Sequence, residues 1–170
     1  MEKFEKDSEN NSEKKPTTDF SLLYKNKEQA IQKRIDVLYQ SMSFSNGTEP
    51  NWINFHDCFT SNAQFINANL DAPMFLDVRT FAQVLDAQIK EHSIPQLFTE
   101  EISQRTQIFG KIAQRFSIFA NKIELDGQPT TRGVNSIQLI CAKGNWLIQS
   151  ISWYNERIDD KIPEQLLTKL

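Results

Sequence analysis

The sequence predicts an α+β fold in which three helices pack on the concave face of a cone-shaped, curved antiparallel sheet. Three observations lead to this prediction. Apolar residues recur at helical spacing between residues 26 and 92, and a single short strand-like segment interrupts them. From residue 98 onward, long strand-like segments follow one another and are separated by turns that contain glycine. Helices that cover one face of a bent sheet leave an open mouth, where pockets form.

The first 18 residues are mainly glutamate, lysine, serine and asparagine, and they offer almost nothing to bury. This composition predicts a disordered polar leader. It contains no apolar segment of the kind found in secretory signal peptides, so we expect a cytoplasmic protein. The predicted organisation is a leader (1–18), one folded domain (19–156) and a C-terminal tail (157–170).

Three helices are predicted before residue 93. The first spans 26–43, and the segment SNGTEP (45–50) ends it. The second is short and places His56 on an apolar face. A brief strand, 63–68, follows and is closed by Pro73. Asp77 is a typical N-cap for the third helix, which ends near His92.

Four long strands are predicted after Pro95. They span 98–109, 112–125, 130–141 and 146–154. Gly110 turns the first, and the pair Asp126 and Gly127 is a strong hairpin signal after the second. The tail carries three leucines near its end, which indicates a short helix that docks on a neighbouring element.

Composition excludes several classes of function. The chain has 170 residues, a net charge of −3 and no basic stripe, so nothing in it favours nucleic-acid binding. No apolar run approaches the roughly 18 residues of a membrane span. Cys58, Cys141 and the two histidines do not follow a metal-site spacing, so we expect free thiols, no metal and no cofactor. The motifs GxSxG, GxGxxG and the P-loop are absent.

This order of elements resembles the nuclear transport factor 2-like superfamily, which has a cystatin-like fold. The residues that carry the resemblance are WINFHDCFTSNAQF, FGKIAQRFSIF, RGVNSIQL and GNWLIQSISWYNE, and it covers about residues 27–156. Within the superfamily, the sequence is most similar to the SnoaL-like and ketosteroid-isomerase-like branch of small bacterial proteins. Because this fold hosts many unrelated activities, the resemblance does not define a reaction.

The resemblance places amides where a ketosteroid isomerase has carboxylates. Asn67 falls at the position of the base, and Asn135 falls at the position of the acid beside a helix tyrosine, here Tyr39. An amide cannot accept a proton at neutral pH, so ketosteroid isomerisation is not expected. Asn135 can still donate a hydrogen bond to a ligand oxygen.

Strand alternation extends this site into a predicted pocket. We take Gln114, Phe116 and Ile118 as the inner face of their strand. Arg115, with Arg132 and Gln138, then lies on the outer face, which the resemblance implies to be a homodimer contact. One of Glu100 and Glu101 must face inward. The predicted ligand-binding residues are Tyr39, Asn67, Gln114, Phe116, Asn135, Gln149 and Trp153.

Three functions remain open at this point. The first is a protein that binds a small neutral or hydrophobic ligand without a known reaction. The second is an isomerase or cyclase acting on a hydrophobic carbonyl compound, with His56 or Asp71 as the base. The third is a dimeric interaction module whose cone is filled by aromatic side chains. A base close to the cavity would favour the second, and a cavity that holds only a few waters would favour the third.

Overall fold

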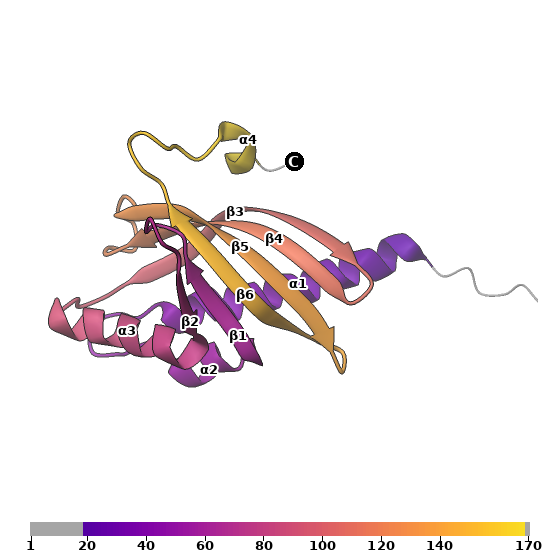
Figure 1. Ribbon diagram of the computed structural model, residues 1–170, viewed down its shortest axis with the longest axis horizontal. Coiled ribbons are helices and arrows are strands. Elements are labelled where there is room, and N and C mark those ends of the chain that lie inside the picture. Colours follow the sequence, from indigo (N-terminus) through magenta and orange to yellow (C-terminus); the bar gives the residue numbers. More distant parts are fainter. Residues whose placement is uncertain (1–18, 169–170) are drawn as a thin grey trace, which may run out of the picture.

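The computed structural model describes residues 19–168; the predicted leader and residues 169–170 lie outside this range. The structure contains one curved sheet of six strands. Figure 1 shows the N-terminal helices on one side of this sheet and the C-terminal segment on the other. The predicted α+β class is therefore confirmed. The elements are α1 (Phe20–Met42), α2 (Trp52–His56), β1 (Phe59–Asn67), β2 (Met74–Asp77), α3 (Val78–Glu91), β3 (Phe98–Phe109), β4 (Ile112–Lys122), β5 (Thr131–Ala142), β6 (Asn145–Asn155) and α4 (Glu164–Leu167).

Most element bounds agree with the expected ones, and the differences have local causes. Helix α1 begins earlier than expected because the carboxylate of Asp19 accepts hydrogen bonds from the backbone N–H groups of Ser21 and Leu22. Strand β2 was not expected. Its four residues are too few for alternation to be recognised, and they form a strand by pairing antiparallel with β1. Asp77 caps α3 as expected.

The sheet has the strand order β2-β1-β6-β5-β4-β3, with β1 and β6 parallel and all other pairs antiparallel. Three irregularities interrupt the register of the sheet. The parallel pairing of β1 with β6 shifts between Phe59 and Gln64. The other two are bulges that interrupt the alternation of side chains. Ile102 is the extra residue in β3, between Glu101 and Ser103. Gln149 is the extra residue in β6, opposite the step from Gln138 to Leu139. Bulges of this kind bend a strand and redirect the side chains on either side of it.

The assignment of the two faces of β4 was wrong. Arg115 is only 1% exposed and lies on the concave face, whereas Phe116 is 39% exposed on the outer face together with Gln114. Alternation was expected correctly, but polarity suggested that the arginine faces solvent. The arginine lies inside because it donates hydrogen bonds to Glu101. Of the two neighbouring glutamates, Glu101 is the one that faces inward. Glu100 instead pairs with Lys122 at the surface.

The core of the protein lies between the concave face and the helices, and aromatic rings occupy much of it. Phe55 is fully buried on α2, and its ring centroid lies 5.0 Å from that of Phe59 and 5.9 Å from those of Phe65 and Phe81. Phe65 and Phe81 are stacked, with centroids 3.8 Å apart. This cluster ties α2 and α3 to β1.

The C-terminal segment crosses the outer face of the sheet, as the leucines of the tail suggested. The hydroxyl of Ser103 on β3 donates to the carbonyl of Leu166 at 2.8 Å. Ile162 is buried, and its N–H donates to the carboxylate of Glu156 at 3.3 Å. No helix within residues 19–168 combines the length and the apolar composition that a membrane crossing requires.

Candidate ligand-binding cavity

A cavity of about 290 Å³ lies inside the cone, between the concave face of the sheet and helices α1 and α3. Nine of its sixteen lining residues are apolar, and Phe65, Phe81, Phe119 and Trp153 supply aromatic surface. The polar residues of the lining are Tyr39, Gln88, Thr99, Asn121, Thr131, Asn135 and Asn155.

The lining carries no aspartate, glutamate, histidine, lysine, arginine or cysteine from the described part of the chain. Tyr39 is its one ionisable side chain. Burial raises the pKa of Tyr39 to about 12, although the hydrogen bond that Asn135 donates to its oxygen acts in the opposite direction. Near neutral pH the cavity is thus uncharged, and it offers no group with the pKa of a general base.

A chain of hydrogen bonds leads from the cavity to a buried ion pair. Asn135 Nδ2 lies 2.9 Å from the hydroxyl of Tyr39, which lies 2.7 Å from the hydroxyl of Ser117. Ser117 donates in turn to Glu101 Oε2. Arg115 donates to both carboxylate oxygens of Glu101, and its Nη2 also donates to the side-chain carbonyl of Gln32 at 2.5 Å.

The predicted ligand-binding residues divide into two groups in the structure. Tyr39, Asn135 and Trp153 come together around the cavity. Gln114, Phe116, Asn67 and Gln149 do not line it, for reasons that differ.

Gln114 and Phe116 lie on the outer face of β4, as described above. Gln149 is the extra residue of the β6 bulge, and its side-chain oxygen accepts a hydrogen bond from Thr60 at 2.9 Å. Asn67 ends β1, and its side-chain oxygen accepts from the backbone N–H and the side-chain amide of Asn69. The face of β4, a bulge in β6 and a turn contact after β1 thus direct these side chains away from the cavity, and alternation along a single strand reveals none of them.

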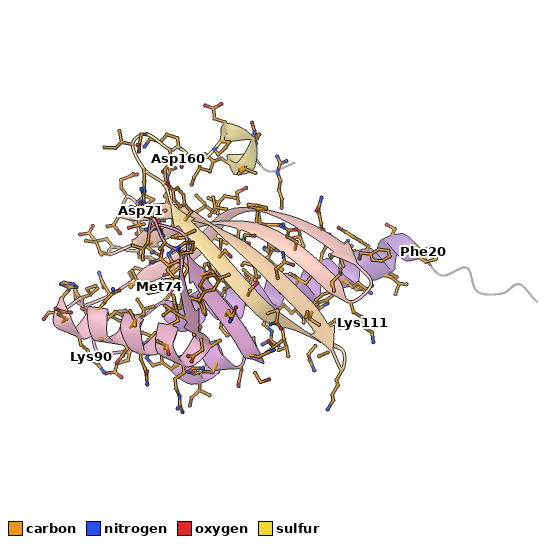
Figure 2. The ribbon with its side chains drawn as sticks, viewed as in Figure 1. Phe20, Asp71, Met74, Lys90, Lys111 and Asp160 are labelled. Atoms are coloured by element: carbon orange, nitrogen blue, oxygen red, sulfur yellow. The ribbon has the colours of Figure 1, made fainter. Side chains whose placement is uncertain are left out.

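The two candidate bases lie away from the cavity. His56 is exposed at the end of α2 and lines a separate polar hollow with Asp77 and Arg79. Figure 2 shows Asp71 in the loop between β1 and β2, where it is exposed. Neither side chain lines the cavity. The cavity lining therefore contains neither of the bases that the isomerase or cyclase hypothesis requires.

Sequence reasoning missed several polar lining residues, among them Asn121, Thr131 and Asn155. Each lies at or next to the end of its strand. Asn121 and Thr131 are direct partners across β4 and β5. Every second side chain of a strand faces the same side of the sheet. Once Arg115 and Ser117 are known to lie on the concave face of β4, Asn121 is therefore expected on that face too.

Gly133 allows the ring of Phe119 to lie against β5 and line the cavity. A Cβ atom at Gly133 would lie 2.6 Å from Phe119 Cζ and 2.5 Å from the backbone oxygen of Tyr154. We expect Gly133→Ala to displace that ring and to lower the free energy of unfolding by about 1–3 kcal/mol. Urea denaturation measures the loss. Ser136→Ala, on the outer face of the same strand, serves as the control and should change stability by less than about 0.5 kcal/mol.

The raised pKa of Tyr39 predicts a loss of stability at alkaline pH. Below pH 10 both the folded and the unfolded chain keep this proton, whereas between pH 10 and 12 mainly the unfolded chain releases it. Stability should therefore fall through this interval, by about 2–3 kcal/mol from this group. Urea denaturation at several pH values, compared with Tyr39→Phe, isolates the effect. An equal loss in the variant would show that Tyr39 is not its source.

Comparisons with known proteins identify the fold. No family model matches the chain, and no curated protein matches it in sequence. Among solved structures, it is similar to a protein of unknown function with a cystatin-like fold from Nostoc punctiforme, at 11% identity and a TM-score of 0.61, over 77% of this chain and 92% of that one.

Two further solved structures support the same assignment. A protein of unknown function from Mycobacterium tuberculosis matches at 14% identity and a TM-score of 0.60, over 84% of this chain and 80% of that one. An NTF2-like protein of unknown function from Shewanella baltica matches at 14% identity and a TM-score of 0.54, over 79% and 97%. The chain therefore has the cystatin-like fold of the nuclear transport factor 2-like proteins.

Proposed function

We propose that this protein is a SnoaL-like binding protein that holds a small, neutral and largely apolar molecule in the cone cavity. The observation that carries the proposal is an uncharged cavity of about 290 Å³ whose lining combines apolar side chains with a few amides and hydroxyls. Small-molecule sites have this composition and begin at about 300 Å³. An engineered cavity of roughly 150 Å³ already binds benzene, so a bicyclic molecule is of suitable size.

The same cavity argues against the two other functions. An acid–base enzyme needs a group of suitable pKa within hydrogen-bond reach of the substrate, and the described lining contains none. A cone filled by aromatic side chains would leave room for only a few waters. A volume of about 290 Å³ corresponds to roughly ten waters at the density of the liquid.

Native mass spectrometry of the purified protein, before and after mild denaturation, tests the proposal. We expect a small molecule to be released at a fixed ratio to the protein. Leu85→Trp, which places an indole in the cavity lining, should abolish this release. Val84→Trp is the matched control, because Val84 is the preceding residue of α3 and is 43% exposed. Equal release from both variants would contradict the proposed location.

We also propose that a second copy of the chain covers the outer face of the sheet. The apolar side chains of Phe116 and Ile140 are 39% and 37% exposed there. Sedimentation should show a dimer, and Phe116→Lys should shift it to a monomer. A monomeric wild-type protein would contradict this contact. Because Cys58 and Cys141 are both free thiols, we place the protein in a reducing, cytoplasmic compartment.

A further inference from the structure

We propose that the molecule held in the cavity is a neutral hydrogen-bond donor, such as an alcohol, a phenol or an N–H heterocycle, and that the side-chain oxygen of Asn135 accepts its hydrogen bond. This inference rests on the proposed function, because it names the class of ligand for the same cavity. The class of ligand follows from the buried ion pair of Arg115 and Glu101. This pair determines which atoms donate in the hydrogen bonds of Ser117, Tyr39 and Asn135.

The first step concerns Ser117. Both carboxylate oxygens of Glu101 accept hydrogen bonds from Arg115, which has only donors. The contact between Ser117 Oγ and Glu101 Oε2 therefore uses the serine proton. A serine hydroxyl has one proton, so Ser117 has none left for Tyr39.

The second step concerns Tyr39. Its hydroxyl lies 2.7 Å from Ser117 Oγ, and the geometry of this contact alone allows either atom to donate. Because the serine proton is already used, Tyr39 is the donor. The tyrosine hydroxyl thus directs its single proton away from the cavity and toward the ion pair. It can then only accept from other groups.

The third step concerns Asn135. Its amide contacts the hydroxyl of Tyr39 at 2.9 Å, and only the Nδ2 end can donate to an oxygen that has no proton to give. The network therefore fixes the orientation of this amide, which atomic positions alone do not. The other end, Oδ1, forms no hydrogen bond with any side chain or backbone group in residues 19–168 and remains available as an acceptor on a cavity-lining residue.

Asn121 also lines the cavity, but its Oδ1 is buried out of reach of a ligand and has no hydrogen-bond partner within residues 19–168. It is therefore not counted as a ligand-binding acceptor. Leaving Asn135 Oδ1 unpaired beside a bound molecule costs free energy, and a ligand that donates to it avoids this cost. The other polar side chains of the lining can donate or accept, so they do not determine which type of ligand is preferred: Gln88, Thr99, Thr131 and Asn155.

A ketone is a poor fit for this arrangement. A carbonyl oxygen beside Asn135 would face another oxygen, Oδ1, and the proton of Tyr39 is directed to Ser117. This point of the cavity thus favours a donor over an acceptor of the same shape. Sites that leave a buried polar group unpaired discriminate strongly between such analogues.

Titration calorimetry with indole and benzofuran tests the inference, because the two molecules have nearly the same shape and differ in an N–H group replaced by an oxygen. We expect the wild-type protein to bind indole at least about tenfold more tightly. Asn135→Leu should reduce this ratio several-fold and leave the affinity for benzofuran unchanged or raised. Asn62→Leu, at an exposed position of β1, is the matched control and should keep the wild-type ratio.

The outcomes separate this inference from the proposed function. Equal affinities, or tighter binding of benzofuran, would overturn the donor class while leaving a binding cavity in place. Binding of neither molecule would overturn both. A preference for indole that persists in Asn135→Leu would overturn the assignment of this residue. The wild-type ratio needs no variant, so a folding defect in Asn135→Leu does not remove the test.

Discussion

Replacement of Arg115 by leucine is expected to lower the free energy of unfolding by about 3–5 kcal/mol, the usual cost of removing one partner of a buried ion pair. The side chains of Arg115 and Glu101 are 2% and 9% exposed, so the remaining carboxylate would have little access to water. Gln32 and Thr106 would also lose the donors that Arg115 directs at them. Urea denaturation followed by circular dichroism measures the change.

Two further variants show whether the buried charge is the cause. Arg79→Leu removes an exposed arginine and should change stability by less than about 0.5 kcal/mol. The double variant Arg115→Leu with Glu101→Leu removes both charges and should recover part of the loss, because apolar pairs commonly replace buried ion pairs without cost. If the double variant is less stable than the single one, the loss comes from packing or from the neighbouring hydrogen bonds.

Truncation of Phe55 to alanine is expected to cost about 3–5 kcal/mol, as for other fully buried aromatic side chains. The ring is 0% exposed and contacts the rings of Trp52, Phe59, Phe65 and Phe81. Its removal leaves a cavity beside the stacked pair of Phe65 and Phe81. Since both of these rings line the ligand cavity, we also expect weaker binding of the indole probe.

Ile53→Ala is the matched control for this prediction. Ile53 lies on the same short helix, two residues before Phe55, and is 77% exposed. We expect it to change the free energy of unfolding by less than about 0.5 kcal/mol and to leave probe binding intact. A loss below about 1 kcal/mol for Phe55→Ala would mean that the aromatic cluster closes over the missing ring.

The sequence predicted the elements well because its local signals agree with the tertiary structure. The periodicity of Ile31, Ile35 and Leu38 predicts α1, and these three side chains are buried in the structure. The turn residues at 110, 126–127 and 143–145 bound the long strands as expected. Strand β2 was missed because only its partner β1 makes it a strand.

The site was predicted less completely, since its geometry depends on pairings that are distant in sequence. Tyr39 and Asn135 are brought together by the pairing of β4 with β5 and the packing of α1 on the sheet. Arg115 was placed on the wrong face because its burial depends on Glu101, a residue on another strand. Gln149 was displaced by a bulge that has no signal in the β6 sequence.

The docking of the C-terminal segment on β3 has a consequence for self-association through the backbone. Strand β3 is an outer strand of an open sheet and spans twelve residues, and such strands can recruit a strand from another molecule. Here residues 101–107 lie at a hollow that Glu28 and Gln32 of α1 and Thr168 of the tail also line. The bulge at Ile102 interrupts the regular edge, and the tail binds Ser103 beside it.

The opposite outer strand, β2, has only four residues and provides a short template. The described residues of the C-terminal segment contribute nothing to the cavity lining, but they lie beside part of β3, and we expect them to hinder amyloid-like strand addition there.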